Sequence, residues 1–311
     1  MRIVFMGTPA AAVPSLQALI DGGHEIVAVW TQPDKPAGRG HRITQSPVKE
    51  LAVSHGLTVH QPAKIRTSES IALFNSHNAD LAVVVAYGRI LPAEFLNAPA
   101  RGCVNVHFSL LPRYRGAAPV NWAIINGETT TGVTTMFIEE ELDAGPILLQ
   151  KETSIGASET APELMKRLSV MGAELLDDTV QQLNGITPRP QNHQDATFAP
   201  MLKKENGLID WTSNAANVEC HVRGLQPWPN AFTHRNHERL IVWRSHVVDV
   251  PPADGLPGEI LAARGDNLVV KCGDQTALRL VELQGEGQRR MSVRDFLNGT
   301  HLKAGERFES P

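Results

Sequence analysis

The chain has few cysteines and lacks the residue spacings that are typical of disulfide-rich or metal-binding proteins. The 311 residues include three cysteines, Cys103, Cys220 and Cys272, which lie far apart and form no C-x-x-C pair. A disulfide framework or a cysteine-bound zinc ion is therefore not expected. No H-E-x-x-H spacing occurs either, so the sequence predicts a protein without a metal.

Long apolar runs are also missing. The first apolar run, Ile3–Met6, is too short for a signal peptide or a membrane span, and no later run reaches about eighteen residues. The composition, 42% hydrophobic and 20% charged, is that of a globular protein, and the length fits about two domains of roughly 150 residues. We therefore expect a soluble, cytoplasmic chain that makes no contact with a membrane.

Two glycine-dependent signatures are incomplete. Gly7 ends the first apolar run, but Ala10–Val13 stand where a dinucleotide fingerprint needs further glycines, so NAD binding is not expected. Ser109 lacks the glycines of a G-x-S-x-G elbow, so it is not expected to be the nucleophile of a hydrolase. Its hydroxyl is expected to bind the backbone of its turn or a ligand.

An overall excess of positive charge is absent too. The net charge is −4, so any contact with RNA has to come from a local patch. From Asp34 to Lys49, four basic residues oppose one acidic residue, which gives a local charge of +3. This segment is either a solvated loop or a basic loop that binds a phosphate backbone. Its basic residues are Lys35, Arg39, Arg42 and Lys49.

Residues 1–150 do contain a regular alternation of short apolar runs and helical segments. The runs are rich in Val and Ile and nearly continuous, as in strands that are buried on both faces. This alternation predicts an α/β fold with a Rossmann-like parallel sheet. Helices are expected to begin at Ser46-Pro47 and at Thr160–Glu163, which have typical capping residues. The predicted strands are Ile3–Met6, Ile26–Trp30, Leu81–Ala86, Val104–Val106 and Val133–Ile138.

The pattern changes in the last third of the chain. We predict a first domain over residues 1–188, a proline-containing linker over 189–206, and a smaller domain over 207–311. Short strands separated by turn signals predict that the smaller domain is an OB-like β-barrel. From Asn206 onward there are 12 basic and 13 acidic residues, so total charge does not support RNA binding there. Lys203 and Lys204 form a local basic pair just before it.

Residues able to do chemistry follow the apolar run Cys103–Val104. Asn105 and His107 stand two positions apart, so at the end of a strand both side chains point to one face. Open α/β sheets bind ligands at the carboxyl ends of their strands. Asp143 lies in the turn after a later strand and can occupy the same edge of the sheet.

These three side chains suit the transfer of an acyl group to an amine. An Asn amide stabilises negative charge that develops on a carbonyl oxygen, and a His exchanges protons near neutral pH. A nearby carboxylate orients the His and supports its charged form. The alternative is structural: Asn105 and His107 are satisfied polar residues at a strand end, and Asp143 caps a turn or helix.

The chain resembles the formyltransferases that use 10-formyltetrahydrofolate. The resemblance rests on Asn105–Pro119, which reads NVHFSLLPRYRGAAP, and on Leu142–Gly145, which reads LDAG. Further segments are similar to the members of this family whose acceptor is initiator methionyl-tRNA. They read FMGTP from Phe5, TQPDKPAGRG from Thr31, VVVAYG from Val83 and GLIDW from Gly207.

The resemblance implies roles for particular residues. Asn105, His107 and Asp143 become the catalytic residues, and the basic segment around Lys35, Arg39 and Arg42 becomes a loop that binds tRNA. Lys203 and Lys204 are expected to bind tRNA as well, on the separate ground that they form a local basic pair. The residues implied for the folate are Ser109, Leu110, Leu111, Pro112, Tyr87, Gly88, Ile90 and Leu91. Phe108 stands where many relatives have Gly or Ala, and in a regular strand it points away from the catalytic face.

The expected function is therefore transfer of a formyl group from 10-formyltetrahydrofolate to initiator methionyl-tRNA, by a protein that acts as a monomer. One alternative is a formyltransferase for a small amine, such as glycinamide ribonucleotide or an amino-sugar nucleotide. The basic loop and the additional β-domain disfavour it, because a small acceptor needs neither. The other alternative, a non-catalytic folate- or RNA-binding module, is disfavoured by the complete set of Asn, His and Asp.

Overall fold

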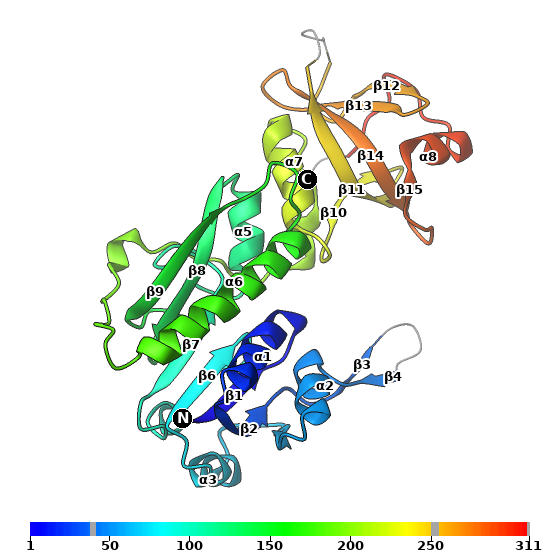
Figure 1. Cartoon of the computed structure of the whole chain (residues 1–311). Helices are drawn as coiled ribbons and strands as arrows, with labels where there is room; N and C mark the ends of the chain where they lie inside the picture. Colours follow the sequence, from blue (N-terminus) through cyan, green and yellow to red (C-terminus); the bar gives the residue numbers. More distant parts are fainter. Residues whose placement is uncertain (38–41, 250–254, 310–311) are drawn as a thin grey trace. The chain divides into compact units, whose positions relative to one another are not determined.

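The chain divides into two units, each of which is described here by itself. The computed structural model describes residues 1–37, 42–249 and 255–309 (Figure 1). Unit 1 comprises Met1–Pro119, Thr130–Ser154 and Met165–Ala199, and unit 2 comprises Val120–Thr129, Ile155–Leu164 and Pro200–Pro311. The domain boundaries predicted from the sequence, including the linker over 189–206, stay a prediction.

Unit 1 is built on a seven-stranded sheet in the order β5-β2-β1-β6-β7-β8-β9. Neighbours from β5 to β7 run parallel, whereas β8 is antiparallel to β7 and β9 is antiparallel to β8. The predicted α/β fold is confirmed, and its sheet is mixed, with antiparallel strands at one edge. The strands are β1 (Arg2–Gly7), β2 (Glu25–Trp30), β5 (Val59–His60), β6 (Leu81–Val85), β7 (Cys103–His107), β8 (Thr130–Phe137) and β9 (Ile147–Ser154).

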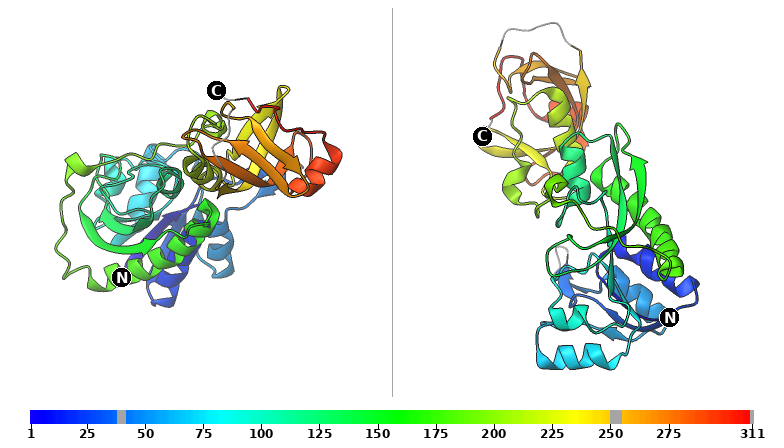
Figure 2. Two further views of the ribbon diagram at one scale, coloured as in Figure 1. Left: turned by 90° about the horizontal axis from the view of Figure 1, so that it is seen from above. Right: turned by 90° about the vertical axis from the view of Figure 1, so that its left-hand side faces the viewer.

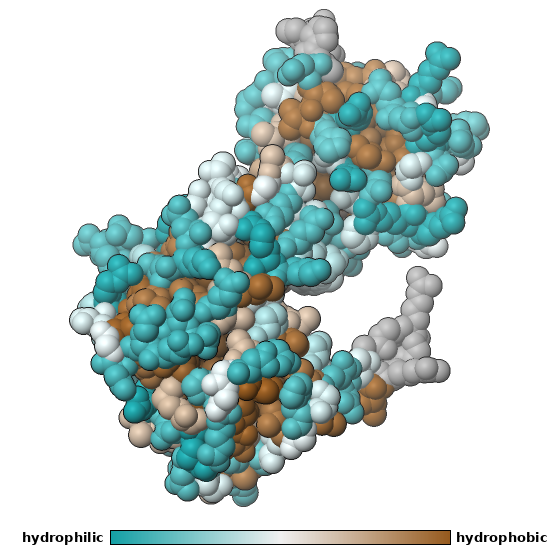
Figure 3. All heavy atoms as spheres, in the orientation of Figure 1, coloured by the Kyte–Doolittle hydropathy of each residue, from teal (hydrophilic) through white to brown (hydrophobic). Residues whose placement is uncertain are grey.

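Helices cover both faces of this sheet, and Figure 2 shows α1 and α6 on the same side of it. On the other side, Phe74 of α3 and Phe95 of α4 stack with ring centroids 4.0 Å apart and pack on Trp30. Hydrophilic residues lie along the exposed side of α6 (Figure 3), as expected of an amphipathic helix. The helices of unit 1 are α1 (Val13–Asp21), α2 (Pro47–Ser54), α3 (Ser68–Ser76), α4 (Ala93–Leu96) and all but the first turn of α6 (Ala161–Gln182), with 3₁₀ turns η1 (Ala10–Ala12) and η2 (His193–Asp195). The helix α5 (Pro119–Ile125) belongs to unit 2 except for its first residue.

The helix starts predicted from capping residues are confirmed. Ser46 precedes α2, and its side chain accepts a hydrogen bond from the backbone N–H of Lys49. Before α6, both the N–H and the hydroxyl of Thr160 donate to the carboxylate of Glu163. These bonds satisfy donors that a helix start otherwise leaves unpaired, so each helix begins where its sequence indicates.

A short hairpin, β3 (Lys35–Ala37) paired with β4 (Arg42–Thr44), projects from the region between β2 and α2. Its base is tied down by a small polar network. Lys49 Nζ lies 2.6 Å from Asp34 Oδ2 and 2.7 Å from Gln61 Oε1, and the Gln61 amide donates to the other Asp34 oxygen at 2.7 Å. The positive charge of Lys49 is therefore engaged in anchoring the hairpin. It does not add to the positive charge of Asp34–Lys49 that is free to bind a phosphate.

Unit 2 contains an antiparallel sheet in the order β10-β11-β14-β13-β12, with β15 paired to β14. The residues before the C-terminus link the two outer strands, because Glu309 pairs with His234 of β10 and Arg307 pairs with Glu259 beside β12. This link gives the sheet the barrel-like closure that was predicted. The elements are η3 (Lys204–Gly207), α7 (Ala215–Gly224), β10 (Ala231–Arg235), β11 (Glu238–Val248), β12 (Ile260–Arg264), β13 (Asn267–Lys271), β14 (Ala277–Gly285), β15 (Met291–Ser292) and α8 (Val293–Gly299).

Two tryptophans of unit 2 have different environments. Trp211 is fully buried, stacks on Phe308 and donates its indole N–H to the hydroxyl of Thr233 at 3.0 Å. For both residues the sequence favours packing, in the core or between domains, over the stacking of nucleic-acid bases, and the core position of Trp211 confirms this for that residue. Trp228 is 54% exposed and is therefore not a core residue. Trp228 follows Gln226-Pro227 and precedes Pro229 in a turn with two cis peptide bonds.

The buried thiols have a structural role. Burial raises the pKa of Cys103 and of Cys272 to about 12, so both stay protonated at neutral pH. Over the ranges that the structure describes, no three His, Cys, Asp or Glu side chains gather in a way that would hold a metal ion. Over the same ranges, every helix is too short or too polar to pass through a lipid bilayer.

Candidate active site

Asn105 and His107 lie at the end of β7 and point to the same face of the sheet. A methyl group placed on Gly172 of α6 would lie 3.0 Å from Val106 and 3.4 Å from Phe108, so these two side chains face α6. Because neighbours alternate along a strand, Asn105 and His107 face away from α6. The expectation that Phe108 points away from the catalytic face is confirmed, and its ring packs beside Gly172 instead.

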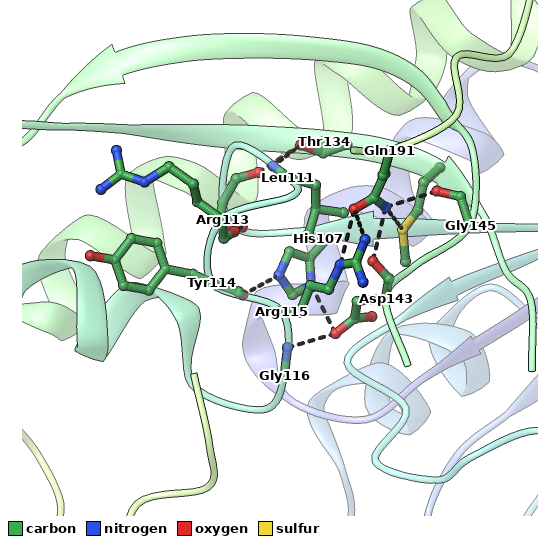
Figure 4. A network of polar contacts seen from close by, with 12 residues as sticks. His107, Leu111, Arg113, Tyr114, Arg115, Gly116, Thr134, Asp143, Gly145 and Gln191 are labelled. Carbon is green, nitrogen blue, oxygen red and sulfur yellow. Dashed lines mark hydrogen bonds and ion pairs between the residues drawn. The ribbon is translucent and has the colours of Figure 1, made fainter. Parts of the chain in front are cut away.

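The buried His107 ring is held by a hydrogen bond at one nitrogen, and its other nitrogen faces a carboxylate (Figure 4). Its Nε2 lies 2.9 Å from the carbonyl oxygen of Tyr114, and its Nδ1 lies 3.7 Å from Asp143 Oδ2. A carbonyl oxygen only accepts, so Nε2 donates and Nδ1 is the nitrogen that faces the carboxylate. The same Asp143 oxygen accepts the backbone N–H of Gly116 at 2.8 Å, which holds the carboxylate in place.

Asp143 reaches His107 by a route that the sequence argument did not foresee. In the antiparallel pairing of β7 and β8, Thr134 lies opposite His107 and Phe137 lies opposite Val104. The carboxyl end of β8 is therefore far along β7 from His107, and the assumption of a shared edge does not apply. Asp143 meets His107 because the loop between β8 and β9 folds back toward the end of β7, with Asp143 itself in the left-handed region at φ +52°.

The amide of Asn105 is not used by the protein. Within the described part of the chain, no group forms a hydrogen bond to this side chain, which is partly exposed. It lies on the same strand face as His107 and opposite Met136 of β8. An amide N–H that is left unpaired is able to donate to an oxygen of a bound substrate.

The turn after β7 is braced from inside. The Ser109 hydroxyl donates to the carbonyl oxygen of Arg113 at 2.6 Å, which confirms that it binds the turn backbone. Thr134 of β8 donates to the Ser109 carbonyl and accepts the N–H of Leu111. Leu111 is buried against Met136 and precedes a cis peptide bond to Pro112. Within the predicted folate segment Ser109–Pro112, Leu110 and Pro112 are the partly exposed members.

The other predicted folate segment, Tyr87–Leu91, follows β6 where the order of the parallel strands reverses between β1 and β6. Crevices at such reversal points are where open α/β sheets bind ligands. Tyr87 and Leu91 are buried in the core, Gly88 turns the chain at φ +80°, and Ile90 is 64% exposed. Contact of this segment with folate stays a prediction, and Ile90 is the member that presents an apolar side chain to solvent.

The residues predicted to bind tRNA are divided between the units. In unit 1, Lys35 is exposed in β3 and Arg42 begins β4, whereas Arg39 lies outside the described residues. In unit 2, Lys203 and Lys204 are exposed at the start of η3. Their contact with tRNA stays a prediction.

Two important residues of the site were missed by the sequence argument. Arg115, which is 1% exposed, donates to the side-chain oxygen of Gln191 from Nε at 3.1 Å and from Nη2 at 2.8 Å. The Gln191 amide donates in turn to the carbonyl oxygens of Asp143 and Gly145. Arg115 is part of the segment on which the resemblance rests, but Gln191 lies in the predicted linker and gave no signal.

Comparison with known proteins agrees with this geometry. Residues 1–180 match the formyl transferase family and residues 201–301 match the formyl transferase C-terminal domain. The chain is 47% identical over 307 residues to the methionyl-tRNA formyltransferase of Alkaliphilus oremlandii, covering 98% of each chain. It is 48% identical over 307 residues to that of Citrifermentans bemidjiense, covering 98% of this chain and 95% of the relative.

A solved structure shares the fold at low sequence identity. A sugar 3N-formyl transferase, WlaRD, crystallised in the presence of dTDP and 5-N-formyl-THF, has a TM-score of 0.68 at 17% identity, covering 93% of this chain and 99% of that one. At this identity the likeness concerns the fold alone. Together with the two family matches and the near-full-length relatives, it leads to one conclusion: the chain belongs to the formyl transferase family, among the methionyl-tRNA formyltransferases.

Proposed function

We propose that this enzyme transfers the formyl group of 10-formyltetrahydrofolate to the α-amino group of initiator methionyl-tRNA. The single observation that carries the proposal is the unused Asn105 amide on the same strand face as the His107–Asp143 pair. Such a set supplies a donor for an oxyanion and a route for protons, which acyl transfer to an amine requires. The relatives at 47–48% identity, which are methionyl-tRNA formyltransferases, support the acceptor.

The donor is a co-substrate that brings the formyl group attached to N10. Two segments at the carboxyl ends of neighbouring strands, Ser109–Pro112 after β7 and Tyr87–Leu91 after β6, are the residues that would hold it. These two segments fit a folate because they lie beside the strand reversal and because Ile90 presents an exposed apolar side chain. The solved relative whose description names a formyl-folate supports this choice of donor.

Each residue of the site has a separate task in the transfer. The amine nitrogen forms a bond to the formyl carbon, and Asn105 donates to the formyl oxygen as negative charge develops there. The amine then loses a proton, the bond from the formyl carbon to N10 breaks, and N10 gains a proton. Asp143 orients His107 and helps to carry these protons, while the turn backbone at Tyr114 and Gly116 fixes both side chains.

The acceptor is a large polyanion, and its binding is assigned to exposed basic residues in both units. Lys35 and Arg42 of the hairpin, Arg39 between them in the sequence, and Lys203 and Lys204 of unit 2 bind phosphates of the tRNA, which gives an affinity that falls with salt. The protein acts as a monomer in the cytoplasm, where charged tRNA and folate are available together.

The test is formyl transfer from 10-formyltetrahydrofolate to initiator methionyl-tRNA, with elongator methionyl-tRNA as a parallel acceptor under identical conditions. Rapid transfer to the initiator species and slow transfer to the elongator species is the expected result. Transfer to neither tRNA, with transfer to glycinamide ribonucleotide or an amino-sugar nucleotide instead, would move the acceptor to a small amine. Folate binding without turnover on any acceptor would indicate that the protein is a non-catalytic binding module.

A further inference from the structure

Arg115 is a buried cation whose main partner is a neutral amide. Its guanidinium donates two hydrogen bonds to the Gln191 oxygen, and its third nitrogen lies 3.3 Å from Glu141, a carboxylate that is 64% exposed. Burying an Arg is costly unless its donors are satisfied. The arrangement therefore fixes the orientation of the Gln191 amide, because only the oxygen of that amide accepts the Arg115 donors.

The fixed amide directs its two N–H groups at the loop that carries Asp143. Gln191 Nε2 lies 2.9 Å from the carbonyl oxygen of Asp143 and 2.8 Å from that of Gly145 (Figure 4). Every strong hydrogen-bonding position of the Gln191 side chain is thus occupied, and the side chain is buried at 7% exposure. The chain from Arg115 through Gln191 reaches the backbone of Asp143, whose carboxylate lies 3.7 Å from His107.

The segment that follows Gln191 also holds the backbone of the turn at residues 114–116. The Tyr114 N–H donates to the Thr197 hydroxyl at 2.8 Å, and the Arg115 N–H donates to the Thr197 carbonyl at 2.8 Å. The Ala199 N–H donates to the Arg115 carbonyl at 2.7 Å. The backbone at 114–116 provides the acceptor for His107 and the donor for Asp143, so residues 191–199 brace both partners of the His107–Asp143 pair.

We propose that Gln191 is a positioning residue for formyl transfer: through its bonds to Arg115 and to the carbonyl oxygens of Asp143 and Gly145, it sets the distance between Asp143 and His107. The inference rests on the proposed catalytic role of Asp143. Gln191 thereby gives a role in the reaction to residues 189–206, which the sequence predicts to be a linker. Gln191 touches no reacting atom and acts by holding the Asp143 loop.

The test is Gln191→Glu, compared with Gln194→Glu as a matched control. A glutamate at 191 keeps acceptors for Arg115 but loses both N–H donors and turns an oxygen toward two carbonyl oxygens. Gln194 lies three residues away, is exposed and has no side-chain partner among the residues that the structure describes. We expect Gln191→Glu to lower kcat about 10- to 100-fold, with KM for the tRNA and for the folate within about threefold, and Gln194→Glu to change neither.

A double-mutant cycle with Asp143→Ala separates positioning from a general loss of structure. If Gln191 acts through Asp143, adding Gln191→Glu to Asp143→Ala lowers kcat no further. Two independent losses that multiply, or an unchanged kcat in Gln191→Glu alone, would overturn the inference while the role of Asp143 stands. An unchanged kcat in Asp143→Ala alone would instead overturn the catalytic role of Asp143, while the absence of formyl transfer in the wild type would overturn the proposed function. If thermal unfolding shows that Gln191→Glu is not folded, Gln191→Met, which keeps size and neutrality, takes its place in the same cycle.

Discussion

The Nε2 atom of His107 donates to the carbonyl oxygen of Tyr114 at 2.9 Å, which leaves Nδ1 as the nitrogen that faces Asp143. This relationship sets the ring orientation before any substrate binds. The turn after β7 therefore also positions the two side chains of the His107–Asp143 pair. The carbonyl of Tyr114 and the N–H of Gly116, two residues apart, hold the His and the carboxylate respectively.

Removal of either member of the pair is expected to slow the chemistry and to leave binding intact. His107→Ala or Asp143→Ala should lower kcat by at least about 100-fold, because positioned proton transfer contributes roughly 10²- to 10⁴-fold. Neither side chain is among the residues assigned to tRNA, so the dissociation constant for the tRNA should stay within about threefold. Single-turnover formylation and a tRNA binding assay measure the two quantities, and a turnover equal to that of the wild type in both variants would contradict the assignment.

The basic hairpin is expected to contribute electrostatically to tRNA affinity. Lys35→Ala or Arg42→Ala should weaken binding and reduce the slope of log Kd against log salt by about one for each phosphate that the side chain neutralises. Lys64→Ala removes an exposed positive charge near α3 and serves as the control. A slope that stays the same in both hairpin variants would argue against the role of this segment.

Gly145, close to Asp143, is required for steric reasons. A methyl group at this position would lie 1.9 Å from the carbonyl oxygen of Phe137, a backbone atom that cannot move aside without displacing β8. Gly145→Ala should therefore lower the free energy of unfolding by about 3 kcal/mol or more. Gly299→Ala, where a methyl group meets nothing within 4 Å, should change it by less than about 0.5 kcal/mol. Urea unfolding of both variants measures these values, and equal stabilities would contradict the steric argument.

Two neighbouring, half-buried histidines are expected to make unit 1 sensitive to acid. The rings of His60 and His77 lie 5.1 Å apart, and the indole N–H of Trp30 donates to His77 Nε2, which must be unprotonated to accept. Burial lowers the pKa of both rings from the ordinary value of 6.5, and for His77 the charges of His60 and Arg2 lower the pKa further. The unfolded chain therefore takes up protons first as the pH falls.

The contribution of this pair to stability is complete above pH 6.5 and is lost as the pH falls from there toward the lowered pKa values of the folded state. Urea unfolding at about pH 7.5 and about pH 5.5 should show a smaller loss of stability in His60→Phe than in the wild type. His55→Phe, at an exposed position of unit 1, should lose as much as the wild type. An identical loss in both variants would show that the half-buried pair His60 and His77 does not titrate as described.

Much of the fold follows from local sequence patterns. The Val- and Ile-rich runs became β1, β2, β6, β7 and β8, because strands buried on both faces need continuous apolar residues. The strand β9 was missed, since ILLQKETS lies at the sheet edge, only its first two residues are buried, and its apolar run ends after three residues. The antiparallel direction of β8 was missed as well, because strand direction depends on how the intervening chain returns and not on the strand's own residues.

The site was only partly predictable for a related reason. Asn105 and His107 share a strand, so their spacing fixes their common face. The contact between Asp143 and His107 depends on a loop path, and its support by Gln191 depends on residues 48 positions apart that no local pattern connects. Trp228 did have a local signal, since it stands between Pro227 and Pro229 in a turn, whereas Trp211 has no proline neighbour.

The role of the Asn105 amide is tested most directly by the single-turnover rate of formyl transfer to initiator methionyl-tRNA by Asn105→Ala, with Asn75→Ala on the surface of α3 as the control. We expect Asn105→Ala to lower this rate about 10²- to 10³-fold at saturating folate and tRNA, because one donor to an oxyanion is removed, and Asn75→Ala to leave it unchanged. A rate for Asn105→Ala equal to that of the wild type would contradict the assignment of this amide to the formyl oxygen.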